Sequence, residues 1–196
     1  MSRQRLFALP LLAMLALAGC LGGMVRGLAP VEIGGGLSVE LPASPSDMPP
    51  FSAGQTLLAR FGETTLLLSL RLHSDGETLR MAAVDGLGRR AVTMTWRDAT
   101  IDAQLAEWLP VGLPASRLLA DIFLAQWPVG IVEKAVRNSG GRVKQRDSLR
   151  IVSRDGVDVV RIEYAGRRET PWSGTTHYSN VAAGYSIEIV SAELSE

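Results

Sequence analysis

Apolar and polar side chains alternate along several consecutive segments of this chain, and that period of two constrains its fold more than any other feature of the sequence. The pattern is clearest over residues 65–73, where leucine occupies every second position. It continues over residues 78–84, 89–96 and 99–105. Turns such as Asp85-Gly86 separate these segments, and glycine accepts the positive φ that a tight hairpin turn requires. The sequence therefore predicts a meander of antiparallel strands, each with one apolar face.

The alternation stops in the middle of the chain, where Pro114 and Pro128 bracket a different pattern. Apolar side chains recur between these prolines at intervals of three and four residues, which indicates an amphipathic helix. Pro114 suits the first turn of a helix because the N–H that it lacks would have no partner there. A second, shorter helix is predicted over residues 130–137.

Strand patterns return after the helices, over residues 148–153, 157–164, 172–180 and 185–190. The chain therefore consists of strands, a helical insertion and further strands. This order favours a mainly β protein of the α+β class, with a strongly twisted antiparallel sheet of about seven to ten strands and helices packed on one side.

The beginning of the chain, residues 1–19, has the three parts of a secretory signal peptide. Arg3 and Arg5 precede an apolar stretch over residues 6–17, which is shorter than the ~20 residues of a membrane-spanning helix. The run Leu17-Ala18-Gly19-Cys20 resembles the lipobox of bacterial lipoproteins. That resemblance implies cleavage before Cys20, acylation of its thiol with chains such as palmitate, and attachment of the mature protein to a membrane. Cys20 is the only cysteine, so no internal disulfide competes for it.

Leu21 follows the cysteine, instead of the aspartate that resembles an inner-membrane retention signal. We therefore expect a lipid-anchored protein of the outer membrane that faces the periplasm. Residues 20–54 are rich in glycine and proline, which predicts a flexible tether with one short strand near residues 37–41. Residues 55–196 are expected to form the folded domain. The balance of 20 basic and 20 acidic residues gives no indication of a nucleic-acid partner.

Three stretches carry a resemblance to a known family. The run from Leu113 through Asp121, the run Leu124-Ala-Gln-Trp-Pro128, and Asn180 with the Gly184–Ile189 ending resemble an uncharacterised bacterial lipoprotein family. Its members are often encoded beside fatty-acid-synthase-like genes for aryl polyene pigments. The architecture is similar to the LolA and LolB lipoprotein carriers, which implies an incomplete antiparallel β-barrel with a helical lid over an apolar cavity. Catalytic residues are not known for that family, so the resemblance assigns none.

An apolar sheet face under an apolar helix either fills with side chains or leaves room for a ligand. Flexible methionine, leucine and aromatic side chains suit a deformable pocket for acyl chains, although the same side chains are typical of an ordinary core. The candidate ligand-binding residues are Leu66, Leu68, Leu70, Met81, Met94, Trp96, Leu119, Phe123 and Trp127.

The sequence gives little support to an enzyme. The two histidines, His73 and His177, occur in no nucleophile or metal-ligand motif, and a trio of His177, Ser116 and Asp121 rests on composition alone. We expect Arg117 to pair with Asp121 on the solvent side of the helix. No cofactor or metal is expected.

The function predicted from the sequence is that of an outer-membrane lipoprotein that binds an acyl-chain or polyene-type hydrophobic ligand, such as a lipid, a lipoprotein or an aryl polyene. It would assist transfer or localisation of that ligand in the cell envelope. The alternative is a structural module without enzymatic activity that docks onto an envelope protein complex through an exposed apolar patch or sheet edge. An internal void open at one rim would favour the first function, and a filled core would favour the second.

Overall fold

The computed structural model describes residues 28–109, 114–166 and 169–195. The predicted signal peptide and Cys20 lie outside these ranges. The described residues form twelve strands and two helices. None of the described helices is both long enough and apolar enough to span a bilayer.

Ten of the strands form one antiparallel sheet with the order β7-β6-β5-β4-β3-β12-β11-β10-β9-β8. Strands β7 and β8 are the two edges and do not pair with each other among the described residues, so the sheet is open and is not a closed barrel. The strands are β3 (Phe51–Phe61), β4 (Thr64–Ser74), β5 (Leu79–Asp85), β6 (Arg90–Arg97), β7 (Thr100–Leu105), β8 (Gly141–Arg146), β9 (Leu149–Arg154), β10 (Val157–Ala165), β11 (Gly174–Asn180) and β12 (Tyr185–Glu193).

The predicted meander is confirmed, because β4, β5, β6 and β7 pair in chain order as antiparallel neighbours. Strand β12 pairs with β3 along its whole length, from Tyr185 opposite Phe61 to Glu193 opposite Ala53. This long-range pairing joins the two halves of the chain into one sheet. The fold is mainly β, as predicted.

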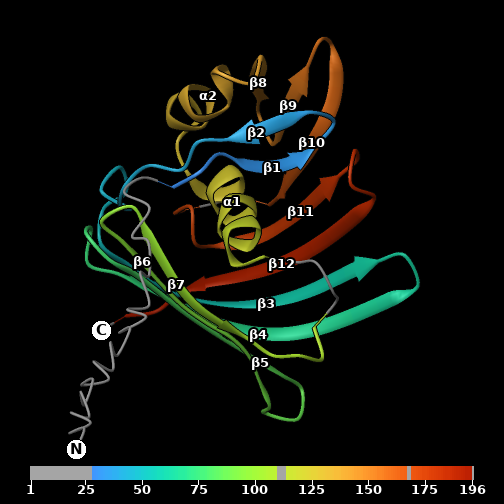
Figure 1. Ribbon diagram of the computed structural model, residues 1–196. Coiled ribbons are helices and arrows are strands. Elements are labelled where there is room, and N and C mark those ends of the chain that lie inside the picture. Colours follow the sequence, from blue (N-terminus) through green and yellow to red (C-terminus); the bar gives the residue numbers. More distant parts are fainter. Residues whose placement is uncertain (1–27, 110–113, 167–168, 196) are drawn as a thin grey trace, which may run out of the picture.

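The helices α1 (Ala115–Gln126) and α2 (Val129–Arg137) follow one another with only Trp127 and Pro128 between them. Figure 1 shows the sheet curving around α1, while α2 lies near β8 at one end of the sheet. Pro114 immediately precedes α1 in an extended conformation, which agrees with its predicted place at the start of the helix.

The expected flexible tether is the main error in the sequence-based prediction. Residues 31–39 form a hairpin of β1 (Val31–Gly34) and β2 (Leu37–Val39), and the side chains of Ile33, Leu37 and Val39 are completely buried. The domain boundary at residue 54 is therefore wrong, because the folded body begins before β1 and β3 begins at Phe51.

The glycines of this segment explain the error. Gly34, Gly35 and Gly36 all have positive φ, at 108°, 61° and 70°, so they make the turn of the hairpin. In the sequence the same glycines look like a linker. A glycine run can serve either purpose, and what distinguishes the two is the apolar residue on each side. The buried core runs through both sheets and both helices, so the hairpin and the large sheet share one hydrophobic core.

Candidate functional site

Helix α1 lies across the inner face of the large sheet (Figure 1). Of the strands, β1 and β7 approach α1 most closely. The middle of the sheet lies farther from the helix, and side chains fill most of the space between them. A cavity of about 60 Å³ remains there. It is lined by Gln55, Leu57, Leu68, Leu70, Met81, Ala83, Val92, Leu118, Asp121, Ile122, Tyr178, Ile187 and Ile189.

The cavity is apolar because inward-facing positions of four central strands, β3, β4, β5 and β12, supply most of its wall. Several of the residues around it, including Leu57, Leu68, Leu118 and Ile187, are only half-buried. One side of this region is therefore reached by solvent. The volume is far below the ~300 Å³ at which pockets for small-molecule ligands begin. As it stands, the space admits only a few carbon atoms.

Asp121 on α1 is the charged group at this cavity, and three side chains bind its carboxylate. The hydroxyl of Tyr178 donates to Asp121 Oδ1 at 2.5 Å, the hydroxyl of Tyr185 donates to Oδ2, and Arg117 Nε lies 3.4 Å from Oδ1. The two tyrosines come from β11 and β12. The cluster of Arg117, Asp121, Tyr178 and Tyr185, called here the Asp121 cluster, therefore joins α1 to the middle of the sheet.

Arg117 extends the Asp121 cluster to the N-terminal hairpin. Its guanidinium donates to the backbone carbonyls of Glu32 at 2.6 Å and of Ile33 at 2.7 Å, and Asn180 of β11 also donates to the Ile33 carbonyl. The predicted pairing of Arg117 with Asp121 is confirmed, but its predicted position is wrong. The Arg117 and Asp121 side chains are only 11% and 6% exposed, so the pair is buried against the sheet.

Burial raises the pKa of Asp121 above the ordinary aspartate value, although the hydrogen bonds from Tyr178 and Tyr185 and the charge of Arg117 act in the opposite direction. Burial also raises the pKa of both tyrosines, and the neighbouring Asp121 carboxylate adds to that rise. Both tyrosines therefore remain protonated donors at neutral pH. The Asp121 cluster therefore joins α1 to the sheet by polar contacts within an otherwise apolar layer. Separating the helix from the sheet would leave a buried carboxylate without its partners, which is unfavourable.

The structure places the nine predicted ligand-binding residues in three environments. Leu68, Leu70 and Met81 line the cavity. Leu66 is half-buried against the core. The remaining five are buried in the core away from the cavity: Met94, Trp96, Leu119, Phe123 and Trp127.

An aromatic group fills the inner face beside the C-terminal half of α1. The Trp127 ring lies 5.4 Å from Phe123, 6.0 Å from Trp96 and 6.3 Å from Trp172, and Trp172 stacks on Phe51 at 3.9 Å. These large side chains fill the space between α1 and the sheet there, and Trp127 also borders a cleft at the end of the helix. The sequence could not separate the filled part of the inner face from the part that holds the cavity, because both are apolar.

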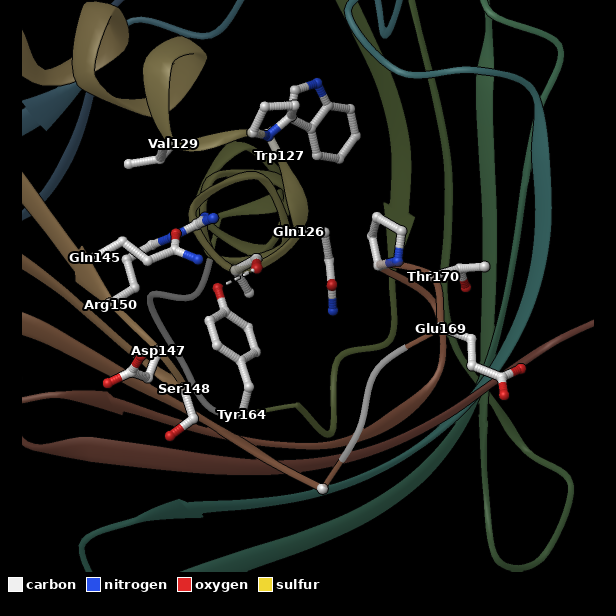
Figure 2. A pocket seen from close by; sticks show the side chains of 14 residues that line it. Gln126, Trp127, Val129, Gln145, Asp147, Ser148, Arg150, Tyr164, Glu169 and Thr170 are labelled. Atoms are coloured by element: carbon white, nitrogen blue, oxygen red, sulfur yellow. Dashed lines mark hydrogen bonds between the residues drawn. The ribbon is translucent and has the colours of Figure 1, made fainter.

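A second, larger cleft of about 540 Å³ lies at the C-terminal end of α1. Its floor includes three polar side chains that are almost fully buried, Gln126, Arg150 and Tyr164, at 4%, 5% and 7% exposure. Figure 2 shows Gln126 pointing into the cleft, with Asp147 and Ser148 on one side and Glu169 and Thr170 on the other.

Two of these floor residues hold the end of the helix. Arg150 donates to the Leu124 carbonyl at 2.5 Å, and the Tyr164 hydroxyl donates to the Ala125 carbonyl at 2.7 Å. The last carbonyls of a helix have no partner within the helix, and a positive charge there is favourable. Arg150 and Tyr164 therefore fix the C-terminal end of α1 to β9 and β10.

The histidine trio is not assembled. His177 is half-exposed and lies 3.8 Å from Glu188 on the outer face of the sheet, whereas Asp121 lies inside it. His73 accepts or donates a hydrogen bond with Ser52 at 2.9 Å, and both side chains are outward-facing. Among the residues that the structure describes, there is no group of three metal-ligating side chains.

Comparison with known proteins places the chain in a family. The model of DUF3261, described as a protein of unknown function, matches residues 52–193, and the chain belongs to that family. No curated protein matches the chain. Among solved structures, a LolA superfamily protein from Nitrosomonas europaea aligns with 8% identity and a TM-score of 0.41, over 76% of this chain and 87% of that chain.

Proposed function

We propose that this protein binds the hydrocarbon chain of a lipid or a lipid-linked molecule between α1 and the inner face of the sheet. The observation that carries the proposal is the apolar cavity beneath α1, where half-buried aliphatic side chains meet solvent at one side. Water expels a hydrocarbon chain, and each methylene that such a site covers contributes ~0.8 kcal/mol. The protein would then shelter an acyl or polyene chain and assist its delivery in the envelope.

The cavity of about 60 Å³ corresponds to the closed form of this site. A chain-like ligand enters only if α1 moves outward from the sheet, so α1 acts as a lid. The Asp121 cluster is then the fastening that the ligand must open or bypass, since it joins α1 to β1, β11 and β12. The aromatic group around Trp127 holds the other half of the helix in place.

The test is binding of cis-parinaric acid, a fatty acid whose fluorescence rises in an apolar environment, to residues 28–196. We expect saturable binding that palmitate displaces. Ala83→Leu places extra carbon atoms in the cavity that Ala83 lines, and it should weaken binding by at least about tenfold, the effect of covering two fewer methylenes. The matched control is Ala165→Leu on the exposed outer side of β10.

Two results would contradict the proposal. If the wild-type protein does not raise the fluorescence of the fatty acid, then hydrocarbon binding is wrong. If Ala83→Leu and Ala165→Leu bind equally well, then the ligand does not lie beneath α1.

We also propose that Cys20 is acylated and anchors the protein in the outer membrane, facing the periplasm. The lipobox-like run Leu17-Ala18-Gly19-Cys20 supports this proposal, and it lies outside the described residues. Incorporation of an alkyne-labelled palmitate in cells, lost in the Cys20→Ser variant, is the expected result. Labelling that persists in that variant would exclude Cys20 as the acceptor.

A docking role is the second candidate, and one observation favours it. The outer face of the sheet carries a groove of about 480 Å³, lined by small and apolar side chains together with Thr56, Ser69 and Arg71. Val190 and Leu194 at this groove are 49% and 36% exposed. Failure of the fatty-acid test would leave this surface as the stronger candidate. We propose no enzymatic activity for either site.

A further inference from the structure

We propose that a group of exposed cations at the β8 edge of the large sheet docks the protein onto a membrane surface that contains anionic phospholipids. This group, called here the basic edge, consists of Lys134 and Arg137 in the last turn of α2 and of Arg142, Lys144 and Arg146 on β8. Figure 1 shows α2 and β8 together at one end of the sheet. The inference goes beyond hydrocarbon binding and does not depend on the cavity beneath α1.

The three cations of β8 form a row on one face of the sheet. In the neighbouring strand β9, Arg150 and Val152 are buried on the inner face. The cations of β8 are paired with the positions between and beside these buried residues: Arg142 with Ser153, Lys144 with Ile151 and Arg146 with Leu149. Because paired residues of antiparallel strands share a face, all three cations lie on the outer face. Cations two residues apart on a strand are ~7 Å from one another, so the row is straight and dense.

Few acidic side chains balance this charge. All five cations of the basic edge are exposed, and in the described part of the chain none of them takes part in an ion pair. The acidic residues adjacent in sequence are Glu133 on α2 and Asp147 in the turn after β8. Five positive charges thus face two negative ones, in a chain whose formal net charge is zero. Arg167 and Arg168 lie outside the described residues, and this balance does not include them.

The next cations across the sheet are different, because each has an acidic partner. Arg154 of β9 lies 3.5 Å from Asp155. Arg161 of β10 lies 3.2 Å from Asp158 and 3.9 Å from Glu163. The unbalanced positive charge is therefore confined to β8 and the end of α2.

The opposite edge of the sheet does not share this charge. The charged residue of β7 is the exposed Asp102, and the exposed Asp98 and Glu107 lie just beyond the two ends of that strand. An anionic surface would therefore attract the β8 edge and not the β7 edge. This difference gives the docked domain a defined orientation.

A phospholipid surface matches the basic edge better than a rigid partner does. No carboxylate holds the cations of β8 in fixed positions, and long basic side chains reach phosphate groups while their stems contact apolar surface. Leu149 and Ile151 supply half-buried aliphatic side chains on the same face, directly beside the cations. Each lysine or arginine near an anionic leaflet strengthens binding about fivefold.

The test is sedimentation of the full chain with phospholipid vesicles. Cys20→Ser is present in every sample, so that no acyl chain on Cys20 contributes. Vesicles of phosphatidylcholine mixed with phosphatidylglycerol are compared with vesicles of phosphatidylcholine alone, which report any binding through the apolar stretch over residues 6–17. We expect tighter binding to the anionic vesicles, and loss of this preference at high salt, which screens exposed charges.

The variant that removes the row is Arg142→Gln, Lys144→Gln and Arg146→Gln together. It should weaken binding to the anionic vesicles about a hundredfold, as three contributions of about fivefold would give. Binding to phosphatidylcholine alone should not change. Lys144→Gln by itself should weaken binding about fivefold, and it tests the inference even if the triple variant folds poorly.

The matched control is Arg60→Gln, Arg71→Gln and Arg90→Gln together. It removes the same number of exposed cations from three different strands, β3, β4 and β6, and should have little effect on binding. Equal losses in the two triple variants would overturn the inference, because binding would then follow net charge alone. Equal binding to both kinds of vesicle would also overturn it, and would favour an acidic strand as the partner of the open edge. A chain that binds anionic vesicles but no fatty acid would refute only the proposed function.

Discussion

The inner face of the sheet has two regions that differ in how completely they are filled. In the aromatic region, the ring centroids of Trp96, Phe123 and Trp172 lie 5.4 to 6.3 Å from that of Trp127. All four side chains are almost fully buried. In the aliphatic region, around Leu57, Leu68, Leu118, Ile122 and Ile187, the side chains are half-buried and a cavity remains.

The two regions share one helix, so the difference cannot come from the helix alone. Adjacent residues of α1 belong to different regions, since Phe123 is completely buried and Ile122 is half-buried beside the cavity. Flat rings fill the space on one side of α1, and branched chains leave some of it on the other. A single helix is therefore closely packed on one side, whereas on the other it borders a cavity and is held by the Asp121 cluster.

The largest expected effect is on the aromatic region. Phe123→Ala should lower the free energy of unfolding by about 4 kcal/mol, because it removes a fully buried ring and leaves a cavity that its neighbours cannot fill. Urea denaturation followed by circular dichroism measures this change. A loss below about 1 kcal/mol would mean that the aromatic region is not tightly packed.

A smaller effect is expected one residue earlier. Ile122→Ala should cost only about 1 to 2 kcal/mol, because the side chain is half-buried and already borders empty space. The same urea measurement applies, so the pair of variants tests the contrast directly. Equal losses for Ile122→Ala and Phe123→Ala would remove the distinction between the regions.

The smallest expected effect is the pH dependence that Asp121 gives to stability. Its pKa is raised in the folded protein above the ordinary value of 3.8. Between 3.8 and the raised value the folded state therefore binds more protons than the unfolded state, and stability falls as the pH rises through that window. The slope from one group is at most about 1.4 kcal/mol per pH unit.

Asp121→Asn should remove this slope, which urea denaturation at several pH values would show. The comparison with the variant is needed because two other aspartates act at lower pH and in the opposite direction. Backbone hydrogen bonds from Thr78 and Glu77 lower the pKa of Asp75. Burial raises the pKa of Asp85, but hydrogen bonds from the side chain and backbone of Arg89 outweigh it and lower the pKa overall. A wild-type protein and an Asp121→Asn variant with identical pH profiles would contradict the raised pKa.

Much of the fold could be predicted because local pattern and tertiary structure agree over most of the chain. The alternation in residues 65–73 became β4, and the apolar stripe between Pro114 and Pro128 became α1. The edge strand β8 was missed because its sequence, with Arg142, Lys144 and Arg146, is mostly charged. Such charges are typical of an edge strand, but they hide the alternation on which the prediction depends.

The candidate site was less predictable than the fold. Leu68, Leu70 and Met81 were correctly placed at the inner face, but Leu57, Ile187 and Ile189 of β3 and β12 were not considered. Their strands meet through a pairing between the two ends of the chain, which no local pattern reveals. The Asp121 cluster has the same origin, because Tyr178 and Tyr185 lie far along the chain from α1.

The N-terminal hairpin has a mechanical consequence. Strands β1 and β2 form a sheet of their own. Arg117 donates hydrogen bonds to the backbone carbonyls of Glu32 and Ile33, and Asn180 donates to that of Ile33. A pulling force applied to the N-terminal end of β1 would act on the hydrogen bonds that Arg117 of α1 and Asn180 of β11 donate to these carbonyls. Tension on the hairpin would therefore be transmitted to α1 through the same arginine that contacts Asp121.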